Sequence, residues 1–176
     1  MRTQPSRRVT IAAVMKSTGL TREAFYAYFR DRHDLITALV APLRIELDEY
    51  IELWRSGTGA LEDDGRASIL GIARIYARDG TLLRALAEAS SYDEEARRAW
   101  QEFTEPAIRA VAERITSEVA AQRMRPFDVA GYVHSLVHMN LATFFSELIG
   151  QPDATVEAVV DRLATVWMRT LDGFRT

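Results

Sequence analysis

Few side chains in this sequence could perform catalysis or hold a metal ion. The chain of 176 residues has no cysteine and only three histidines, of which His134 and His138 lie four residues apart. On a helix this spacing places both rings on one face, but no acidic residue or further histidine completes a metal site nearby. A structural role for the pair is therefore favoured. The lack of cysteine excludes thiol catalysis, disulfides and cysteine-ligated metals. Because no nucleotide-binding, serine-hydrolase or zinc-protease motif occurs, we expect neither an enzyme nor a cofactor.

Hydrogen bonding to a DNA duplex is the chemistry that residues near the N-terminus indicate. Arg22 lies near the start of a short predicted helix, and its guanidinium can bond O6 and N7 of a guanine. Thr21 can cap this helix and also contact the backbone or a base. Glu23 can accept from cytosine N4, although complementing the helix dipole is the more common role of an acidic residue there. Ala24 can lie against a thymine methyl group.

Residues 9–35 form the elements that would position these side chains. Their sequence, VTIAAVMKSTGLTREAFYAYFRDRHDL, predicts a helix, a turn at Gly19, a second helix and the start of a third helix capped by Asp31. Two short helices joined by a glycine-containing turn are typical of a helix-turn-helix, whose second helix enters the major groove. Thr10 and Arg32 lie at predicted helix N-termini, where the backbone amides and positive charge suit a DNA phosphate group. The alternatives are that Thr10 only caps its helix and that Arg32 is a solvated surface charge.

The same stretch resembles the helix-turn-helix signature of the tetracycline-repressor (TetR) family. The matching positions are Thr10, Val14, Gly19-Leu20-Thr21, Phe25-Tyr26, Tyr28-Phe29, Arg32 and Leu35. The resemblance implies an all-α fold, a dimer, a palindromic operator, and phosphate contacts from the hydroxyl groups of Tyr26 and Tyr28. Family members have a complete helix upstream of this signature. Only eight residues precede Val9 here, and they include Pro5, so we expect that first helix to be missing from this sequence. Either the start is assigned too far downstream, or the protein is a shortened member of the family.

Charge is distributed unevenly along the chain. Residues 1–35 hold seven Lys and Arg against three Asp and Glu, a net charge of +4, which leaves −7 for the remainder of a chain whose total is −3. A basic end on an acidic body is expected where that end faces phosphates.

The rest of the sequence predicts only helices. Helical periodicity covers residues 31–54 with Pro42 inside, 67–78, 81–89 after Gly80, 93–123 with Pro106 inside, 128–149 and 154–173, and residues 56–65 read as a connector. The predicted class is all-α, with a DNA-binding part at residues 1–41 and a helical ligand-binding and dimerisation domain at residues 42–176.

Large apolar side chains gather in the second part, where a ligand pocket would lie. The set includes Trp54, Tyr76, Trp100, Phe103, Met139, Phe144, Phe145 and Trp167. Such a set is usually core, but Asn140 lies among these residues and its amide needs partners, which a ligand could supply. Pairing across a dimer is the alternative for Asn140. The stretch Met139-Asn140…Thr143 with Phe145, Trp100 and Phe103 resembles the ligand domain of the ethionamide-resistance repressor group. From the apolar set and this resemblance together, we expect Trp100, Phe103, Met139, Asn140, Phe144, Phe145 and Trp167 to bind a ligand.

The last two predicted helices have apolar faces that are wider than one core-facing stripe. In the resembled family these helices form the dimer interface. No run of membrane-spanning length and no signal peptide occurs, so we expect a cytoplasmic protein without a membrane partner.

Together these features predict a transcriptional repressor that binds a palindromic operator as a homodimer and is released by a small lipophilic effector. The alternative is a truncated helical dimer that does not bind DNA and acts as a small-molecule sensor or a protein-interaction module.

Overall fold

Aspartate side chains begin three of the helices. In the computed structural model, which describes residues 21, 26–57 and 59–176, Asp31 accepts from the Asp34 amide at 2.8 Å and Asp93 from the Ala96 amide at 2.9 Å. Asp128 likewise accepts from the Gly131 amide at 3.0 Å. Each carboxylate satisfies an amide that has no partner within its helix. The caps predicted at Asp31 and Asp93 are confirmed.

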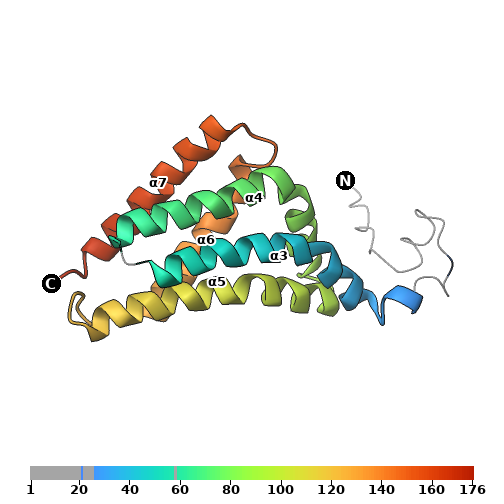
Figure 1. Ribbon diagram of the computed structural model, residues 1–176, viewed down its shortest axis with the longest axis horizontal. Coiled ribbons are helices and arrows are strands. Elements are labelled where there is room, and N and C mark those ends of the chain that lie inside the picture. Colours follow the sequence, from blue (N-terminus) through green and yellow to red (C-terminus); the bar gives the residue numbers. More distant parts are fainter. Residues whose placement is uncertain (1–20, 22–25, 58) are drawn as a thin grey trace, which may run out of the picture.

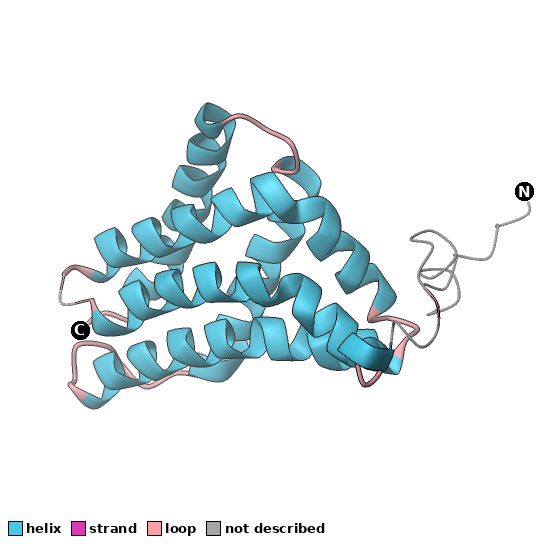
Figure 2. Cartoon of the chain, turned by 45° about the vertical axis from the view of Figure 1, so that its right-hand side comes forward, coloured by secondary structure: helices cyan, strands magenta, loops and turns pink. Residues whose placement is uncertain are grey.

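Five long helices make up the body of the protein. They are α3 (Arg32–Ser56), α4 (Leu61–Ala89), α5 (Glu94–Ala120), α6 (Val129–Glu147) and α7 (Asp153–Asp172). Helix α3 lies between α4 and α5, α6 packs on α4 and α5, and α7 packs on α4 (Figure 1). The described residues contain no β-strand beyond one isolated bridge between Met124 and Arg175, so the predicted all-α class is confirmed (Figure 2).

Both internal prolines lie within continuous helices, as the sequence predicted. Helix α3 continues through Pro42 and α5 continues through Pro106. A proline leaves the carbonyl four residues earlier without its helical donor.

The predicted break at Gly80 is wrong, because α4 runs without interruption from Leu61 to Ala89. It also includes residues 61–65, which the sequence had placed in a connector. A methyl group at position 80 would come within 2.6 Å of the Ile149 side chain. Gly80 therefore allows the chain after α6 to lie close to α4, a tertiary reason that local patterns do not reveal.

Gly71 has a similar role on the opposite side of α4. A methyl group at this position would overlap the aromatic ring of Tyr50 from α3. The absence of a side chain lets the two helices approach until that ring rests on the α4 backbone.

The core runs through all five helices. Its most buried side chains include Ile75, Leu83, Ile115, Val133, Leu148, Val156, Val160 and Leu171. The apolar stripe predicted on α7 faces this core. No helix in the described part of the chain is long and apolar enough to cross a membrane.

Candidate ligand cavity

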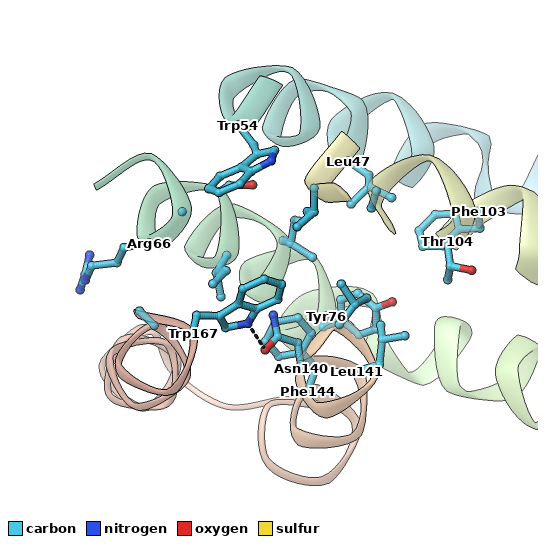
Figure 3. A pocket seen from close by; sticks show the side chains of 18 of the residues that line it. Leu47, Trp54, Arg66, Tyr76, Phe103, Thr104, Asn140, Leu141, Phe144 and Trp167 are labelled. Carbon is cyan, nitrogen blue, oxygen red and sulfur yellow. Dashed lines mark hydrogen bonds between the residues drawn. The ribbon is translucent and has the colours of Figure 1, made fainter. Parts of the chain in front are cut away.

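A cavity with an almost wholly apolar wall lies inside the helical body (Figure 3). Its volume is about 90 Å³, counted as the space open to the centre of a water molecule. One water needs roughly 10–15 Å³ on that measure, so there is room for a small organic molecule. The lining comprises Leu47 and Trp54 of α3; Gly65, Arg66, Ser68, Ile69, Ile72 and Tyr76 of α4; Phe103, Thr104, Ala107 and Val111 of α5; Val137, Asn140, Leu141 and Phe144 of α6; and Ala164, Trp167 and Met168 of α7.

Four of the seven residues predicted to bind a ligand line this cavity, namely Phe103, Asn140, Phe144 and Trp167. Asn140 and Phe144 are four residues apart on α6 and therefore share one face of the helix.

The other three predicted residues, Trp100, Met139 and Phe145, are not among those that line it. The Trp100 ring stacks on Phe103 at 6.0 Å between centroids and also lies 6.0 Å from the Phe145 ring. Met139 and Phe145 each neighbour a lining residue in sequence, and one step along a helix turns the side chain by about 100°. These three residues pack against the core from a second layer.

Asn140 has an internal partner. The Trp167 indole Nε1–H donates to Asn140 Oδ1 at 3.1 Å, which joins α6 to α7 at the cavity wall (Figure 3). Because an indole nitrogen can only donate, the amide must present its oxygen to Trp167 and its Nδ2 elsewhere. The oxygen is thus satisfied within one chain, whereas pairing across a dimer was the alternative.

Several lining residues are not among the seven predicted to bind a ligand, although Trp54 and Tyr76 belong to the apolar set noted in the sequence. Ile69, Ile72 and Tyr76 recur at helical spacing along α4, and that stripe was the available signal. No sequence pattern indicates Gly65, because its place in the wall depends on the Trp54 ring. A β-carbon at position 65 would lie 3.1 Å from that ring.

Arg66 marks the edge of the cavity. Its side chain lines the wall and is also 41 % exposed, so the cavity meets solvent there. The guanidinium pairs with Asp161 of α7, with Nε 2.7 Å and Nη2 2.5 Å from Oδ1. An ion pair between two exposed side chains adds little stability and separates easily.

The carbonyl freed by Pro106 is bound by α3. Arg44 Nη1 of α3 donates to the Glu102 carbonyl at 2.6 Å and approaches the Phe103 carbonyl at 3.5 Å. Glu102 is four residues before Pro106, so its carbonyl has no helical donor. The guanidinium therefore connects α3 to the turn of α5 that places Phe103 in the cavity wall.

A second contact joins the same turn of α5 to the start of α3. His33 Nε2 lies 3.3 Å from Glu102 Oε2, and its Nδ1 lies 3.3 Å from the Glu95 carbonyl. The beginning of α3 thus touches α5 at Glu95 and at Glu102, the residue before Phe103.

The predicted DNA-binding residues fall mostly at the edge of the described structure or beyond it. Thr10, Arg22, Glu23 and Ala24 lie outside the described residues, and Arg32 is the first residue of α3. Thr21, Tyr26 and Tyr28 are exposed, and residues 26–28 are helical.

The two histidines of α6 face outward. His138 Nδ1 lies 2.8 Å from the His134 carbonyl, and the two ring centroids are 4.0 Å apart. Within the described residues, no group of three or more His, Cys, Asp or Glu side chains is arranged to hold a metal.

The structure is thus an all-α domain whose helices pack around an apolar cavity that meets solvent at Arg66. The model of the family described as "Transcriptional regulator EthR, C-terminal domain" matches residues 65–173, and the chain belongs to this family.

Two further proteins are similar to this chain over most of its length. The chain is 26 % identical over 181 aligned positions to the HTH-type transcriptional regulator EthR of Mycolicibacterium smegmatis, covering 98 % of this chain and 81 % of that protein. Its fold matches the crystal structure of a protein from Syntrophomonas wolfei described as a TetR-family transcriptional regulator, with a TM-score of 0.69, 13 % identity, and coverage of 90 % of this chain and 84 % of the other. The protein is therefore a transcriptional regulator of the TetR family with an EthR-like C-terminal domain.

Proposed function

We propose that this regulator is a repressor that binds a palindromic operator as a homodimer and leaves it when a small, uncharged, mostly apolar molecule enters the cavity. The cavity is the observation that carries this proposal, because its wall includes side chains from all five helices. A ligand that fills such a space contacts every helix of the body at once.

The outward faces of α6 and α7 support the dimer part of the proposal. Tyr132 of α6 and Val166 of α7 are 42 % and 38 % exposed, although both are large apolar side chains. The interface of the resembled family lies on these two helices. A two-fold dimer presents two recognition helices to half-sites about one turn of DNA apart, roughly 34–36 Å.

The Arg44 contact supports a route from the cavity to the DNA. A ligand that displaces Phe103 moves the turn of α5 whose Glu102 carbonyl is bound by Arg44 of α3. Helix α3 begins directly after the predicted recognition helix, so a shift of α3 changes the spacing of the two DNA-binding ends. The effector must prefer the conformation that does not bind DNA, since equal affinity for both states shifts nothing.

DNA binding is tested by titrating two variants on the promoter of the regulator's own gene and on a random duplex. Arg22→Ala should remove the preference for the promoter, because that side chain is proposed to bond a guanine. Arg32→Ala should weaken binding to both duplexes and lower the slope of log K against log salt by about one, as expected for one lost phosphate contact.

If both variants bind both duplexes as the wild-type protein does, Arg22 does not contact a base and Arg32 does not contact a phosphate. If the wild-type protein has no salt-dependent affinity for either duplex, the repressor proposal fails, and a helical small-molecule sensor that does not bind DNA becomes the better description.

A further inference from the structure

The hydroxyl group of Tyr76 is a buried polar group that the fold does not use. Tyr76 is 2 % exposed, and its ring is held by Phe144 and Phe145 of α6 at centroid distances of 5.2 and 5.3 Å. These contacts fix the position of the Tyr76 ring in the cavity wall, and they therefore also fix the direction of its phenol oxygen (Figure 3).

Within the described part of the chain, Tyr76 Oη has no hydrogen-bond partner. Every side-chain nitrogen or oxygen atom that is fully buried in the described residues has a hydrogen-bond partner. Because Tyr76 Oη has none, it is not fully buried and must border open space. Because Tyr76 lines the cavity and is almost wholly removed from bulk solvent, that space is the cavity itself.

The other hydroxyl groups of the wall are already occupied. Ser68 Oγ donates to the Tyr50 carbonyl at 2.9 Å, and Thr104 Oγ1 donates to the Trp100 carbonyl at 3.0 Å. The indole of Trp167 is committed to Asn140. Tyr76 Oη and Asn140 Nδ2 are the polar groups that remain for a ligand.

Both of these remaining groups are uncharged donors. Burial raises the pKa of the Tyr76 phenol, so it keeps its proton at neutral pH and can donate it. The guanidinium of Arg66, at the cavity edge, is paired with Asp161. A charged ligand would lose its hydration here, and Arg66 lies at the solvent edge of the cavity and not beside the two buried donors, so an uncharged ligand is favoured.

We propose that Tyr76 is a specificity-determining residue whose hydroxyl donates to an oxygen atom of the effector, and that the effector is an uncharged apolar molecule bearing such an acceptor, such as a ketone, ester or amide. This inference rests on the proposed function, because it names the chemistry of the molecule that enters the same cavity. A pure hydrocarbon would leave the Tyr76 donor unsatisfied.

The test compares wild type with Tyr76→Phe, which removes one oxygen atom and leaves the ring. The probes are the isomeric linear nonanones, which carry the carbonyl at successive positions along the chain, and nonane, which has none. Dissociation constants come from intrinsic tryptophan fluorescence, since Trp54 and Trp167 both line the cavity. Tyr92→Phe, at an exposed tyrosine that does not line the cavity, is the matched control.

We expect at least one nonanone to bind Tyr76→Phe about threefold to tenfold more weakly than wild type, the usual worth of one neutral hydrogen bond. Nonane should bind both proteins equally, which also shows that the cavity of the variant is intact. Tyr92→Phe should behave as wild type does.

Two different results would overturn the inference, and they distinguish the role of the Tyr76 hydroxyl from the role of the cavity. If nonanones bind wild type and Tyr76→Phe with equal affinity, the hydroxyl does not recognise the ligand, while the cavity stands as the effector site. If wild type binds neither the nonanones nor nonane, the effector part of the proposed function fails as well.

Discussion

Helix α5 is joined to α3, and α7 to α4, by different kinds of polar contact. Between α3 and α5 the contacts reach the backbone: Arg44 binds the Glu102 carbonyl, Arg114 donates to the Trp54 carbonyl at 2.5 Å, and Trp54 Nε1 donates to the Ala110 carbonyl at 3.2 Å. The Arg114 guanidinium also lies 4.6 Å from the centre of the Trp54 ring. Such contacts fix the register of one helix along the other.

Between α4 and α7 the polar contacts are ion pairs at the surface. Arg66 pairs with Asp161, and Arg74 lies 3.4 Å from Glu157. Their side chains are about half exposed, so solvent screens the attraction and each pair contributes little. The apolar faces beneath them hold the two helices together.

The two sides of the cavity therefore differ in what they can do when a ligand binds. The α3–α5 side can transmit movement, because a shift of the α5 backbone pulls directly on α3. On the α4–α7 side the polar contacts break at low cost, so the Arg66 edge of the cavity can open while the apolar faces of the two helices stay packed. Three substitutions test this difference, in order of decreasing effect.

Trp54→Ala should have the largest effect. It removes a buried indole from the α3–α5 side, the hydrogen bond to Ala110 and the surface on which Arg114 rests. We expect the free energy of unfolding to fall by about 3–5 kcal/mol. Urea unfolding followed by circular dichroism measures it, and a loss below about 1 kcal/mol would show that this side is not the more tightly fixed one.

Arg44→Ala should have an intermediate effect, because it removes the donor to the Glu102 carbonyl. A hydrogen bond from a charged group stabilises by about 1.5–3 kcal/mol, and partial exposure places this one at the lower end. The same variant should retain operator affinity but lose part of its response to ligand. Arg78→Ala, which removes an exposed guanidinium and its side-chain contacts to Glu46 and Asp79, is the control for stability.

A double-mutant cycle with Pro106→Ala sharpens this prediction. Alanine at position 106 restores an N–H that can reach the Glu102 carbonyl within α5. The cost of Arg44→Ala should then shrink. Strict additivity of the two substitutions would mean that Arg44 does not act through the freed carbonyl.

Arg66→Ala should have the smallest effect on stability, below about 1 kcal/mol, because it removes only an exposed ion pair. It should nevertheless speed the association of a nonanone with the cavity, since Arg66 stands at the cavity edge. Arg74→Ala is the matched control, because it breaks a pair on the same side of the body away from the lining. Stopped-flow fluorescence should separate the two variants, and identical association rates would exclude Arg66 as part of the entrance.

Features that depend on a few neighbouring residues could be predicted from the sequence. The caps at Asp31 and Asp93 follow from local chemistry, and the structure confirms them. The continuity of α3 through Pro42, which the family resemblance favoured over a boundary between two helices, is confirmed as well. The family resemblance at residues 9–35 also led to the correct family, although most of those residues lie outside the described structure.

Features that depend on how helices meet could not be predicted. Gly80 reads as a break until Ile149 is seen to fill the space beside it. Met139 and Phe145 have suitable side chains for a cavity wall, but the rotation of α6 turns them away from it. The bond from Arg44 to Glu102 joins residues 58 positions apart, so no pattern along the chain reveals it.

The close approach of α3 and α4 at Gly71 also bears on how this protein can change over time. Since a methyl group at position 71 would occupy the place of the Tyr50 ring, Gly71 cannot be exchanged for a larger residue while Tyr50 is kept. Relatives with a larger residue at the first position should carry a smaller one at the second. Paired substitutions of this kind across many related sequences would be an evolutionary record of how tightly these two helices must fit.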